Sequence, residues 1–471
     1  MNTIFIPSGQ CNQASAENVA NAGLRVVVCD DDKPLHSTAM MKSIAAGCGE
    51  EDYTFVFFSH DTLIPGADCF KRMAEIGDAT GACMLYSDYR RRDAKGNITM
   101  CPVIDYQEGS LRDDFEFGPL VAFRTAALKK AVAEMTEDYN AAGFYDMRLR
   151  LSRKGEIVHI NEPLYTVSEP ASDTSHHEAQ FAYVDPRNRA SQIEMERACT
   201  AHLKATGAWL SPDFRKPDFN QSDFRCEASV IIPVRTRCRT IADALNSALT
   251  HKTDFPYNVI VIDNHSTDGT TEIIDKMTAS HPNLIHIIPD RDDLGIGGCW
   301  NTGVRHPECG RFACQLDSDD VYSNSNVLQR IVDEFRRQGV AMIVGSYRLT
   351  DFDGRELPPG VIDHREWTSD NGRNNALRIN GLGAPRCFHT PILRETGLPN
   401  TSYGEDYAAG LRISREYQIG RIYDVLYNCR RWEGNSDAAP SREKMNANNL
   451  YKDRIRTWEL QARRRINAEK K

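Results

Sequence analysis

Short apolar runs alternate with longer amphipathic stretches along much of the chain. In the second half, residues 230–234 (VIIPV), 259–263 (VIVID), 284–288 (LIHII) and 312–316 (FACQL) have the pattern of buried strands. The intervening residues 241–249, and the stretch opened by Asp268 and Gly269, have the pattern of helices. Buried strands that alternate with helices predict an α/β fold with a largely parallel sheet.

The two halves of the chain share a diverged internal repeat at an offset of about 260 residues. Segments 57–61, 121–125 and 145–152 match segments 316–320, 386–390 and 405–414, in the same order. Since order and spacing are both kept, the sequence predicts two similar α/β domains in tandem. We expect them at residues 1–167 and 226–436, joined by a mainly helical connector at 168–225 and followed by a basic C-terminal helix at 437–471.

Composition narrows the possible partners. The 471 residues carry a formal net charge of −9, which opposes a general affinity for nucleic acid. No apolar run approaches the roughly 20 residues that cross a bilayer, and the first residues lack the pattern of a secretory leader. We therefore expect a cytoplasmic protein.

The cysteines do not predict a metal or disulfide framework. The chain has 14 of them, scattered singly and without any C-x-x-C pair. The pair His176-His177 has no cysteine near it, so structural zinc is not favoured there.

An acidic cluster follows the carboxyl end of one predicted strand, in the stretch QLDSDD at 315–320. Asp317 and Asp319 can reach the same hard divalent cation, with Asp320 as a further ligand. A solvated surface turn is the alternative, but this edge of an open α/β sheet is where ligands bind.

Further polar groups follow neighbouring elements. Asp263 ends a strand and is suited to contact a base or ribose, while Asp268 can cap the next helix. A glycine-rich turn at 294–303, which includes Asn301, allows the backbone to approach a ligand closely. Glu405 and Asp406 open a predicted helix, where a carboxylate can serve as a general base.

Together, VIIPV, VIDNHSTDGT, GCWNTG, LDSDD and GED, in this order, resemble the inverting glycosyltransferases of family 2, which have the GT-A fold. The resemblance covers roughly residues 228–435. It implies transfer of a sugar from a UDP- or GDP-linked donor to a saccharide acceptor, and metal roles for Asp317 and Asp319 with Mn²⁺ or Mg²⁺. It also implies that Asp406, with Glu405 beside it, takes the proton of the acceptor hydroxyl. The remaining donor-binding residues that it suggests are Pro233, Val234, Arg235, Arg237, Asp263, Asn301 and Ser318.

Residues 428–432 (NCRRW) resemble the Gln-x-x-Arg-Trp element of processive members, with Asn in place of Gln. Arg430 or Arg431 could contact the donor pyrophosphate, and Trp432 could stack on an acceptor sugar. An arginine pair beside a partly buried tryptophan is the alternative without a ligand.

The first half lacks these motifs. No VIIPV-type strand is recognised before residues 25–30, and the Asp-x-Asp position reads Ser59, His60 and Asp61. We therefore expect a degenerate copy that binds no donor. Beyond residue 438 the chain is rich in Lys and Arg, which allows either peripheral contact with the inner membrane face or packing on the connector.

Two rival functions stay open. A catalytically silent protein that binds nucleotide-sugars or glycans would not need Asp317, Asp319 and Asp406 together. A nucleotidyltransferase would share a similar fold, and only Arg235 and Arg237 support it. The sequence leaves the donor base, the sugar and the acceptor open.

Overall fold

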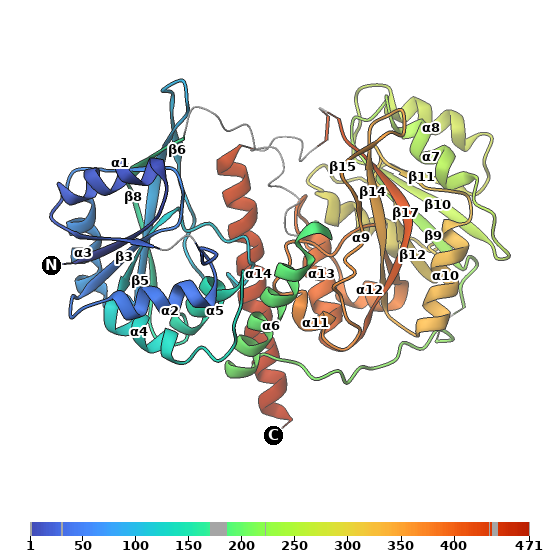
Figure 1. The fold of residues 1–471 in the computed structure, drawn as a ribbon. Helices are drawn as coiled ribbons and strands as arrows, with labels where there is room; N and C mark the ends of the chain where they lie inside the picture. The colour runs from blue at the N-terminus through green and yellow to red at the C-terminus, as the bar shows by residue number, and fades with distance from the viewer. Residues whose placement is uncertain are drawn as a thin grey trace. The chain divides into compact units, whose positions relative to one another are not determined.

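The computed structural model describes residues 2–29, 32–169, 186–221, 223–432, 434–435 and 441–470. The chain forms two compact units, one within residues 1–183, 188–209 and 441–471 and the other within 184–187 and 210–440. Figure 1 shows that each unit is built around a sheet flanked by helices. The predicted histidine pair at 176–177 and much of the predicted connector lie outside the described residues.

The second unit contains a nine-stranded sheet in the order β11-β10-β9-β12-β16-β14-β17-β13, with β15 paired to β14. Its strands are β9 Ala228–Val234, β10 Tyr257–Asp263, β11 Leu284–Ile287, β12 Phe312–Gln315, β13 Val321–Tyr322, β14 Met342–Thr350, β15 Glu356–Ile362, β16 Arg386–His389 and β17 Ile419–Arg430. Its helices are α7 Ile241–Leu249, α8 Thr270–Thr278, α9 Ile296–Arg305, α10 Val327–Gln338, α11 Gly372–Asn375, α12 Thr390–Thr396 and α13 Glu405–Ser414.

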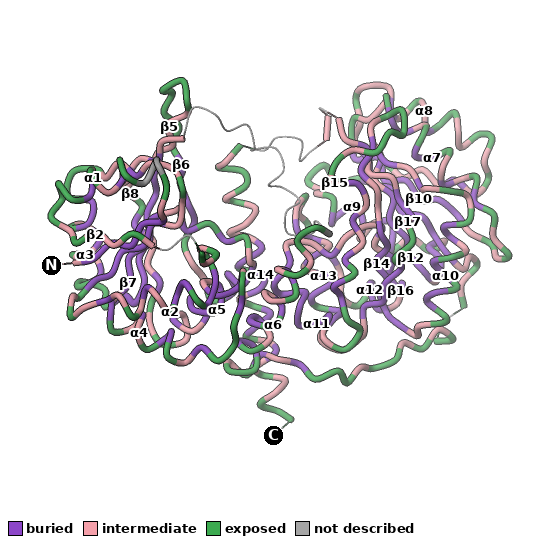
Figure 2. The backbone as a smooth tube through the Cα atoms, in the orientation of Figure 1, coloured by how far each residue is buried: buried purple, intermediate pink, exposed green. Residues whose placement is uncertain are grey.

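The central strands of this sheet are buried because helices cover both of their faces. β9, β10 and β12 pair in parallel and consist almost entirely of buried residues, as Figure 2 shows. Apolar runs without polar alternation are typical of such strands. The predicted strands and the helix Ile241–Leu249 are therefore confirmed to within a few residues, and so is the α/β class.

The first unit contains an eight-stranded sheet in the order β2-β1-β3-β7-β5-β8-β4, with β6 paired to β5. Its strands are β1 Thr3–Pro7, β2 Arg25–Cys29, β3 Tyr53–Phe57, β4 Thr62–Pro65, β5 Met84–Arg92, β6 Ile98–Cys101, β7 Leu120–Arg124 and β8 Ile157–Ser168. Its helices are α1 Gln10–Ala20, α2 Thr38–Gly47, α3 Cys69–Thr80, α4 Thr125–Ala133, α5 Gly143–Leu151, α6 Arg189–Ala205 and α14 Arg442–Glu469.

The two sheets have the same strand order once β11, which has no counterpart in the first unit, is set aside. Phe123 in β7 lies opposite Thr54 and Met84. Phe388 in β16 lies opposite Ala313 and Met342 in the same way. The prediction of two similar domains in tandem is therefore confirmed at the level of topology and register.

One expectation about the first unit is wrong. Residues Thr3–Pro7 (TIFIP) form β1, a fully buried central strand that pairs with β2 and β3 as β9 pairs with β10 and β12. Pro7 lies opposite Cys29, and Pro233 lies opposite Ile262, so β1 is the counterpart of VIIPV. The sequence hides this strand because its apolar run is short and the motifs that follow VIIPV in the second unit do not follow it here.

The helices α6 and α14 belong to the first unit rather than to separate segments. On α14, Arg456 is fully buried and pairs with Asp453 at 2.8 Å, and Arg463 pairs with Glu459 at 2.7 Å. Arg464 pairs with Glu108 and donates to the Thr206 carbonyl. Much of the basic character of this helix is therefore used inside the unit, which weakens the expectation of a membrane-binding face.

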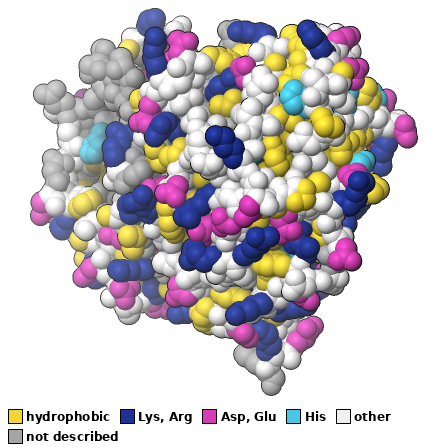
Figure 3. All heavy atoms as spheres, turned by 90° about the vertical axis from the view of Figure 1, so that its right-hand side faces the viewer, with side chains coloured by type: hydrophobic (Ala, Val, Ile, Leu, Met, Phe, Trp, Pro, Cys, Tyr) yellow, Lys and Arg dark blue, Asp and Glu magenta, His cyan; other side chains and the backbone are white. Residues whose placement is uncertain are grey.

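The surface does not offer a broad field of one sign on the face drawn in Figure 3, where basic and acidic side chains are interspersed. Among the described residues, no helix combines the length and the apolar character that a membrane crossing requires. Most of the described cysteines are buried.

Candidate active site

The carboxyl end of β12 holds the first group of predicted site residues. The Gln315 side chain donates from Nε2 to both carboxylate oxygens of Asp317, at 2.9 and 3.0 Å. Its Oε1 accepts a hydrogen bond from the Arg386 backbone N–H at 3.0 Å. Gln315, the first residue of QLDSDD, therefore fixes the orientation of Asp317 and ties it to β16.

Asp319 lies two residues after Asp317. Its carboxylate is bonded by residues near the C-terminal end of the second unit. Its Oδ2 accepts from Asn435 Nδ2 at 3.1 Å and from Trp432 Nε1 at 3.3 Å. The Arg237 Nε lies 3.9 Å from the same oxygen. The sequence suggested Arg237 and Trp432 for the site but missed Asn435, which no motif singled out.

Asp320 has a different task from its two neighbours. Its Oδ1 accepts the Arg430 backbone N–H at 2.7 Å, and burial raises the pKa of Asp320 well above its usual range. Asp320 therefore supports the backbone of β17, and its suggested role as a further metal ligand stays a prediction.

Arg430 sits beneath the acidic loop. Its Nε donates to the Asp319 carbonyl at 2.6 Å and its Nη1 donates to Asp243 at 2.8 Å. Its Nη2 has no hydrogen-bond partner among the described residues, although the side chain is buried. One donor of Arg430 thus remains for a ligand, while the neighbouring Arg431 donates its backbone N–H to the Thr350 carbonyl at 2.8 Å.

The electrostatics of the loop favour a cation. Burial raises the pKa of Asp317, the Arg386 guanidinium and the Gln315 amide oppose that shift, and the Asp319 charge adds to it. Two carboxylates crowded in this way gain from a positive ion between them. Among the described residues, no group of three or more candidate ligands from histidine, cysteine and acidic residues gathers.

Two protein carboxylates suit an ion that takes its other ligands from water and from substrate phosphates, as Mg²⁺ commonly does. The residues present therefore fit a divalent cation bound together with a diphosphate. They do not form a cage built by the protein alone.

The second group of predicted residues opens α13. Gly404 precedes the helix with φ 76°, which a residue with a side chain rarely adopts, and Glu405 and Asp406 follow in its first turn. Arg386 Nη1 lies 2.7 Å from Asp406 Oδ2 in an ion pair. The pairing favours the ionised form of Asp406, the form that can accept a proton.

Glu405 differs from its neighbour. Its side chain is buried, and its Oε2 has no hydrogen-bond donor among the described residues. Burial, with the Asp406 charge as the second cause, raises the pKa of Glu405 to about 8. Of the two candidates for the base, Asp406 is therefore the one that an ion pair with Arg386 holds.

Arg386 is the site residue that the sequence did not reveal. Its guanidinium is paired with Asp406, and the charges of Asp406, Asp317 and Glu405 together outweigh burial and raise the pKa of Arg386. Arg386 thus brings the acidic loop and the start of α13 into one site. A lone arginine in an ordinary strand carries no sequence signal for such a role.

The predicted nucleotide-facing residues end β9 and β10. Asp263 is fully buried, and its carboxylate accepts from the Ser266 N–H at 3.0 Å and the Thr271 hydroxyl at 2.5 Å. Burial alone would raise the pKa of Asp263, but these hydrogen bonds outweigh it and lower the pKa. The carboxylate therefore shapes the loop after β10, and its proposed contact with a base stays a prediction.

The loop after β9 contains the other predicted donor-binding residues. Val234 is buried, Pro233 is half-buried, and Arg235 is exposed. The Arg237 backbone N–H donates to Thr270 Oγ1 at 2.8 Å, and the Cys238 N–H donates to Asp268 at 3.0 Å. Asp268 therefore joins this loop to the start of α8, in addition to bonding the Thr270 N–H at 3.2 Å.

The glycine-rich turn at the start of α9 packs on protein. A Cβ at Gly297 would lie 1.9 Å from the Pro399 carbonyl oxygen, and one at Gly298 would lie 2.2 Å from Asn400 Oδ1. Both ends of the Asn301 amide bond the Leu398 backbone, at 2.7 and 3.0 Å. The glycines of this turn therefore pack closely on the loop before α13, and Asn301 supports that loop. The predicted contact of Asn301 with a donor stays a prediction.

Trp432 is half-buried and lies between charged and aromatic neighbours. The Arg239 guanidinium lies 5.1 Å from the centre of its ring, and the Phe352 ring packs edge-on at 5.6 Å. Because its N–H already bonds Asp319, the ring is held in one orientation next to the acidic loop.

Comparison with known proteins identifies the family of one part of the chain. Residues 229–397 match the family model described as glycosyl transferase family 2. Chondroitin synthase of Escherichia coli is 32% identical over 210 residues, which is 42% of this chain and 28% of that protein. The poly(ribitol-phosphate) beta-N-acetylglucosaminyltransferase TarS of Staphylococcus aureus strain Mu50 is 27% identical over 179 residues, 36% of this chain and 29% of TarS.

Among solved structures, a mannosyltransferase from Pyrobaculum calidifontis, in complex with GDP-Man and Mn²⁺, matches with 16% identity and a TM-score of 0.35. The match covers 58% of this chain and 85% of that one. The chain spans less than a third of the length of the two sequence relatives named above. By the family match, residues 229–397 form a glycosyltransferase family 2 domain.

Proposed function

We propose that the second unit transfers a sugar from a nucleoside-diphosphate sugar, linked to UDP or GDP, to a hydroxyl of a saccharide acceptor, with inversion at the anomeric carbon. The observation that carries this proposal is the ion pair of Arg386 with Asp406, 2.7 Å long, beside the Asp317 carboxylate. It brings a candidate base and a candidate metal-binding pair into one site.

In this mechanism, Asp406 accepts the proton of the acceptor hydroxyl as its oxygen attacks the anomeric carbon, and the bond from that carbon to the diphosphate oxygen breaks. Attack from the face opposite the diphosphate inverts the configuration. Arg386 keeps Asp406 ionised and oriented before the acceptor arrives.

Asp317 and Asp319 would hold Mn²⁺ or Mg²⁺, which screens the charge that develops on the leaving diphosphate. Arg430 supports this loop from below and has its Nη2 available for a phosphate oxygen. Trp432 offers a fixed ring against which an acceptor sugar can stack.

The relatives suggest the biological setting. Chondroitin synthase and TarS are both named for building or decorating polymers, and a polymeric or lipid-linked saccharide acceptor is therefore proposed here. A silent donor-binding protein is less consistent with the site, because such a protein has no use for an ionised base held by an arginine.

The test is an assay of the full chain with a panel of UDP- and GDP-sugars, Mn²⁺ and short oligosaccharide acceptors. We expect release of nucleoside diphosphate that depends on acceptor, and NMR of the product should show the anomeric configuration opposite to that of the donor. Release of pyrophosphate from nucleoside triphosphates would indicate a nucleotidyltransferase, and donor binding without any turnover would indicate a silent binding protein.

A further inference from the structure

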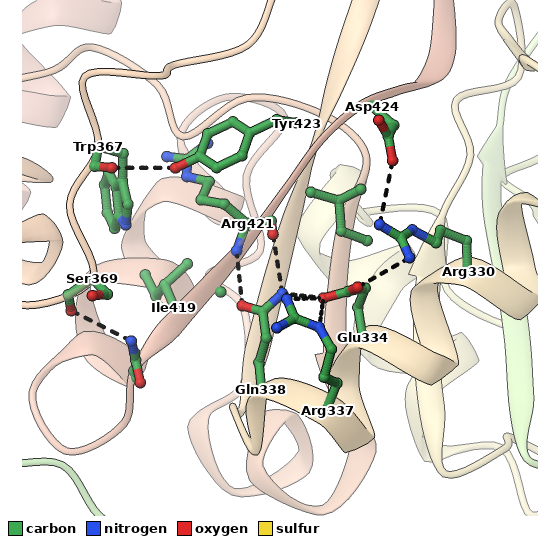
Figure 4. A pocket seen from close by; sticks show the side chains of 13 residues that line it. Arg330, Glu334, Arg337, Gln338, Trp367, Ser369, Ile419, Arg421, Tyr423 and Asp424 are labelled. Atoms are coloured by element: carbon green, nitrogen blue, oxygen red, sulfur yellow. Dashed lines mark hydrogen bonds and ion pairs between the residues drawn. The ribbon is translucent and has the colours of Figure 1, made fainter.

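The second unit contains a cavity of about 500 Å³ at the other end of β17 from Arg430. Its wall is formed by the second half of α10, by residues near Trp367 and by the first half of β17, as Figure 4 shows. The lining residues are Arg330, Glu334, Arg337, Gln338, Trp367, Ser369, Gln418, Ile419, Gly420, Arg421, Ile422, Tyr423 and Asp424. A volume of this order is typical of small-molecule sites.

Arg421 is the unusual member of this wall. Its side chain is only 7% exposed, and its guanidinium lies 4.3 Å from the centre of the Trp367 ring. Its Nη1 donates to the Leu382 carbonyl at 2.7 Å, but its Nε and Nη2 have no acceptor among the described residues. Burial lowers the pKa of Arg421 to about 10, although the charge of Glu366 opposes this shift.

The other charged groups of the wall are already paired. Glu334 accepts from Arg337 Nε at 2.8 Å and lies 3.2 Å from Arg330 Nη1. Asp424 lies 3.3 Å from Arg330 Nη2. The backbone of Arg421 is also satisfied, because the Gln338 amide bonds both its N–H and its carbonyl, at 3.3 and 3.0 Å. In the described part of this wall, the Arg421 guanidinium is therefore the charged group that has hydrogen-bond donors without acceptors.

The equivalent position in the first unit shows which partners surround a side chain at this point of the fold. Tyr86 in β5 lies opposite His159 in β8, and Val344 in β14 lies opposite Arg421 in β17. His159 is therefore the counterpart of Arg421. It lies between two carboxylates, with Nε2 at 2.9 Å from Asp88 and Nδ1 at 2.8 Å from Asp105.

Neither of these carboxylates serves Arg421 in the second unit. The counterpart of Asp88 is Ser346, whose hydroxyl donates to the Ile422 carbonyl at 3.0 Å. The counterpart of Asp105 is Glu366, which bonds His364 at 3.2 Å. Among the described residues, no ion pair within 4.0 Å joins an acidic side chain to Arg421.

The two unpaired nitrogens define the kind of ligand. Nε and Nη2 form one edge of a guanidinium, and two parallel hydrogen bonds from this edge match a carboxylate. The same edge binds carboxylates elsewhere in this chain. Arg72 bonds Glu162 through Nε at 3.0 Å and Nη2 at 2.6 Å, and Arg291 bonds Asp293 at 2.8 and 2.6 Å.

We propose that this cavity is a second ligand site, which binds a small carboxylate, such as a sugar acid, through Nε and Nη2 of Arg421. The carboxylate takes the place that Asp88 and Asp105 occupy around His159 in the first unit. The Ser369 hydroxyl and the Gln418 amide lie in the same wall and suit the hydroxyls of a sugar. This site does not depend on the proposed transfer reaction, since it uses none of the residues at the acidic loop or at α13.

The test is calorimetric titration of the full chain with sodium glucuronate, succinate, glucose and inorganic phosphate. We expect both carboxylates to bind and glucose not to bind. Tighter binding of glucuronate than of succinate identifies a sugar acid as the ligand class, and equal binding identifies small carboxylates in general. Phosphate that binds as well as the carboxylates, or a wild-type chain that binds no carboxylate, would overturn the proposal.

Variants place the ligand. Arg421→Gln keeps a donor for the Leu382 carbonyl but loses the charged edge, so glucuronate affinity should fall by about ten- to a hundredfold. Ser369→Asp adds a negative charge at an exposed lining position and should also weaken binding, without the risk to folding that a buried substitution carries. The matched control is His159→Gln in the first unit, which should leave binding unchanged, and Asp317→Asn should leave it unchanged as well. Unaltered affinity in Ser369→Asp and in a folded Arg421→Gln would contradict the site.

Discussion

The carboxyl edges of the two sheets show how one fold can carry or lose a reaction site. The register places Phe58 at the position of Asp317 and His60 at that of Asp319, one residue earlier than the sequence suggested. It places Val121 at the position of Arg386. In the first unit, the His36 ring stacks on Phe58 with centroids 5.3 Å apart, and the Phe144 ring packs on Phe58 at 4.6 Å. Aromatic packing thus replaces the charged network of the second unit, while strand order is kept.

The difference teaches which residues belong to the fold and which to the chemistry. Features common to both units, such as the central strand ending in Pro7 or Pro233, serve the sheet. Gln315, Arg386 and the carboxylates they hold occur in the second unit alone, and they therefore define its site. Each prediction below removes one of these differences or tests a position where the units should not differ.

The largest effect is expected at Asp406. Asp406→Asn keeps the shape of the side chain but cannot accept the acceptor proton, so transfer should fall by roughly a hundred- to ten-thousandfold. Donor affinity should be retained. Steady-state transfer and donor titration of the variant measure the two effects separately, with the exposed Asp353→Asn as the control. Loss of donor affinity as well would place Asp406 in the donor site instead.

A smaller loss is expected when Arg386 is changed. Arg386→Gln removes the ion pair with Asp406, and the charge-assisted contact is worth about ten- to a hundredfold in turnover. Arg386→Lys should recover part of this. Arg412→Gln, on the exposed face of α13, is the matched control. Equal turnover in the glutamine variant and wild type, in a protein with an unchanged melting temperature, would remove Arg386 from the site.

Glu405 should make the second unit less stable as the pH rises. Its pKa is raised in the folded state to about 8 from an ordinary value of 4.5, so the folded protein keeps a proton that the unfolded chain has lost between these values. The stability contribution is therefore full below pH 4.5 and is lost as the pH rises toward 8. A shift of this size corresponds to about 3 to 5 kcal/mol.

Melting curves of wild type and Glu405→Gln between pH 5.5 and 8.5 test this. We expect the melting temperature of the wild type to fall by on the order of 10 °C more than that of the variant. The exposed Glu395→Gln should behave as wild type does. A parallel fall in wild type and Glu405→Gln would show that Glu405 is ionised throughout.

The smallest effect is expected in the first unit. Asp61→Ala and Asp146→Ala should leave transfer nearly intact, because the aromatic packing around Phe58 leaves no place for a donor metal. Asp146→Ala should lower the stability of its own unit, since it breaks the ion pair with Arg150 at 3.0 Å. A large loss of turnover in a variant that melts normally would indicate a second active unit.

The sequence predicts much of this picture because apolar strands and acidic motifs leave local patterns. The α/β class, the repeat and the placement of Asp317, Asp319 and Asp406 all follow from such patterns. β1 is missed because its apolar run is short and no donor-loop motif follows it. The packing of Asn301 and of the α9 glycines on the loop before α13 is not evident from the sequence, because contact with protein and contact with a ligand require the same residue types.

Other features depend on contacts between segments far apart in the sequence. Arg386 acquires its role only when β16 is placed beside β12 and α13. Asn435 bonds Asp319 although the two residues are far apart in the sequence, and no motif contains both of them. The lack of acceptors among the described residues at one edge of Arg421 is recognised only by comparison with His159, its structural counterpart. The carboxylate partners of His159 lie on other segments of the chain.

The most direct test of the central claim, that donor binding belongs to the second unit alone, is calorimetric titration with UDP and GDP in the presence and absence of Mn²⁺. It compares wild type, Asp317→Asn/Asp319→Asn and His60→Ala/Asp61→Ala. The account predicts Mn²⁺-dependent binding of the matching nucleotide to wild type and to the first-unit variant, and its loss in the Asp317 and Asp319 variant. Unchanged affinity in the Asp317 and Asp319 variant, or a loss caused by the substitutions at His60 and Asp61, would contradict it.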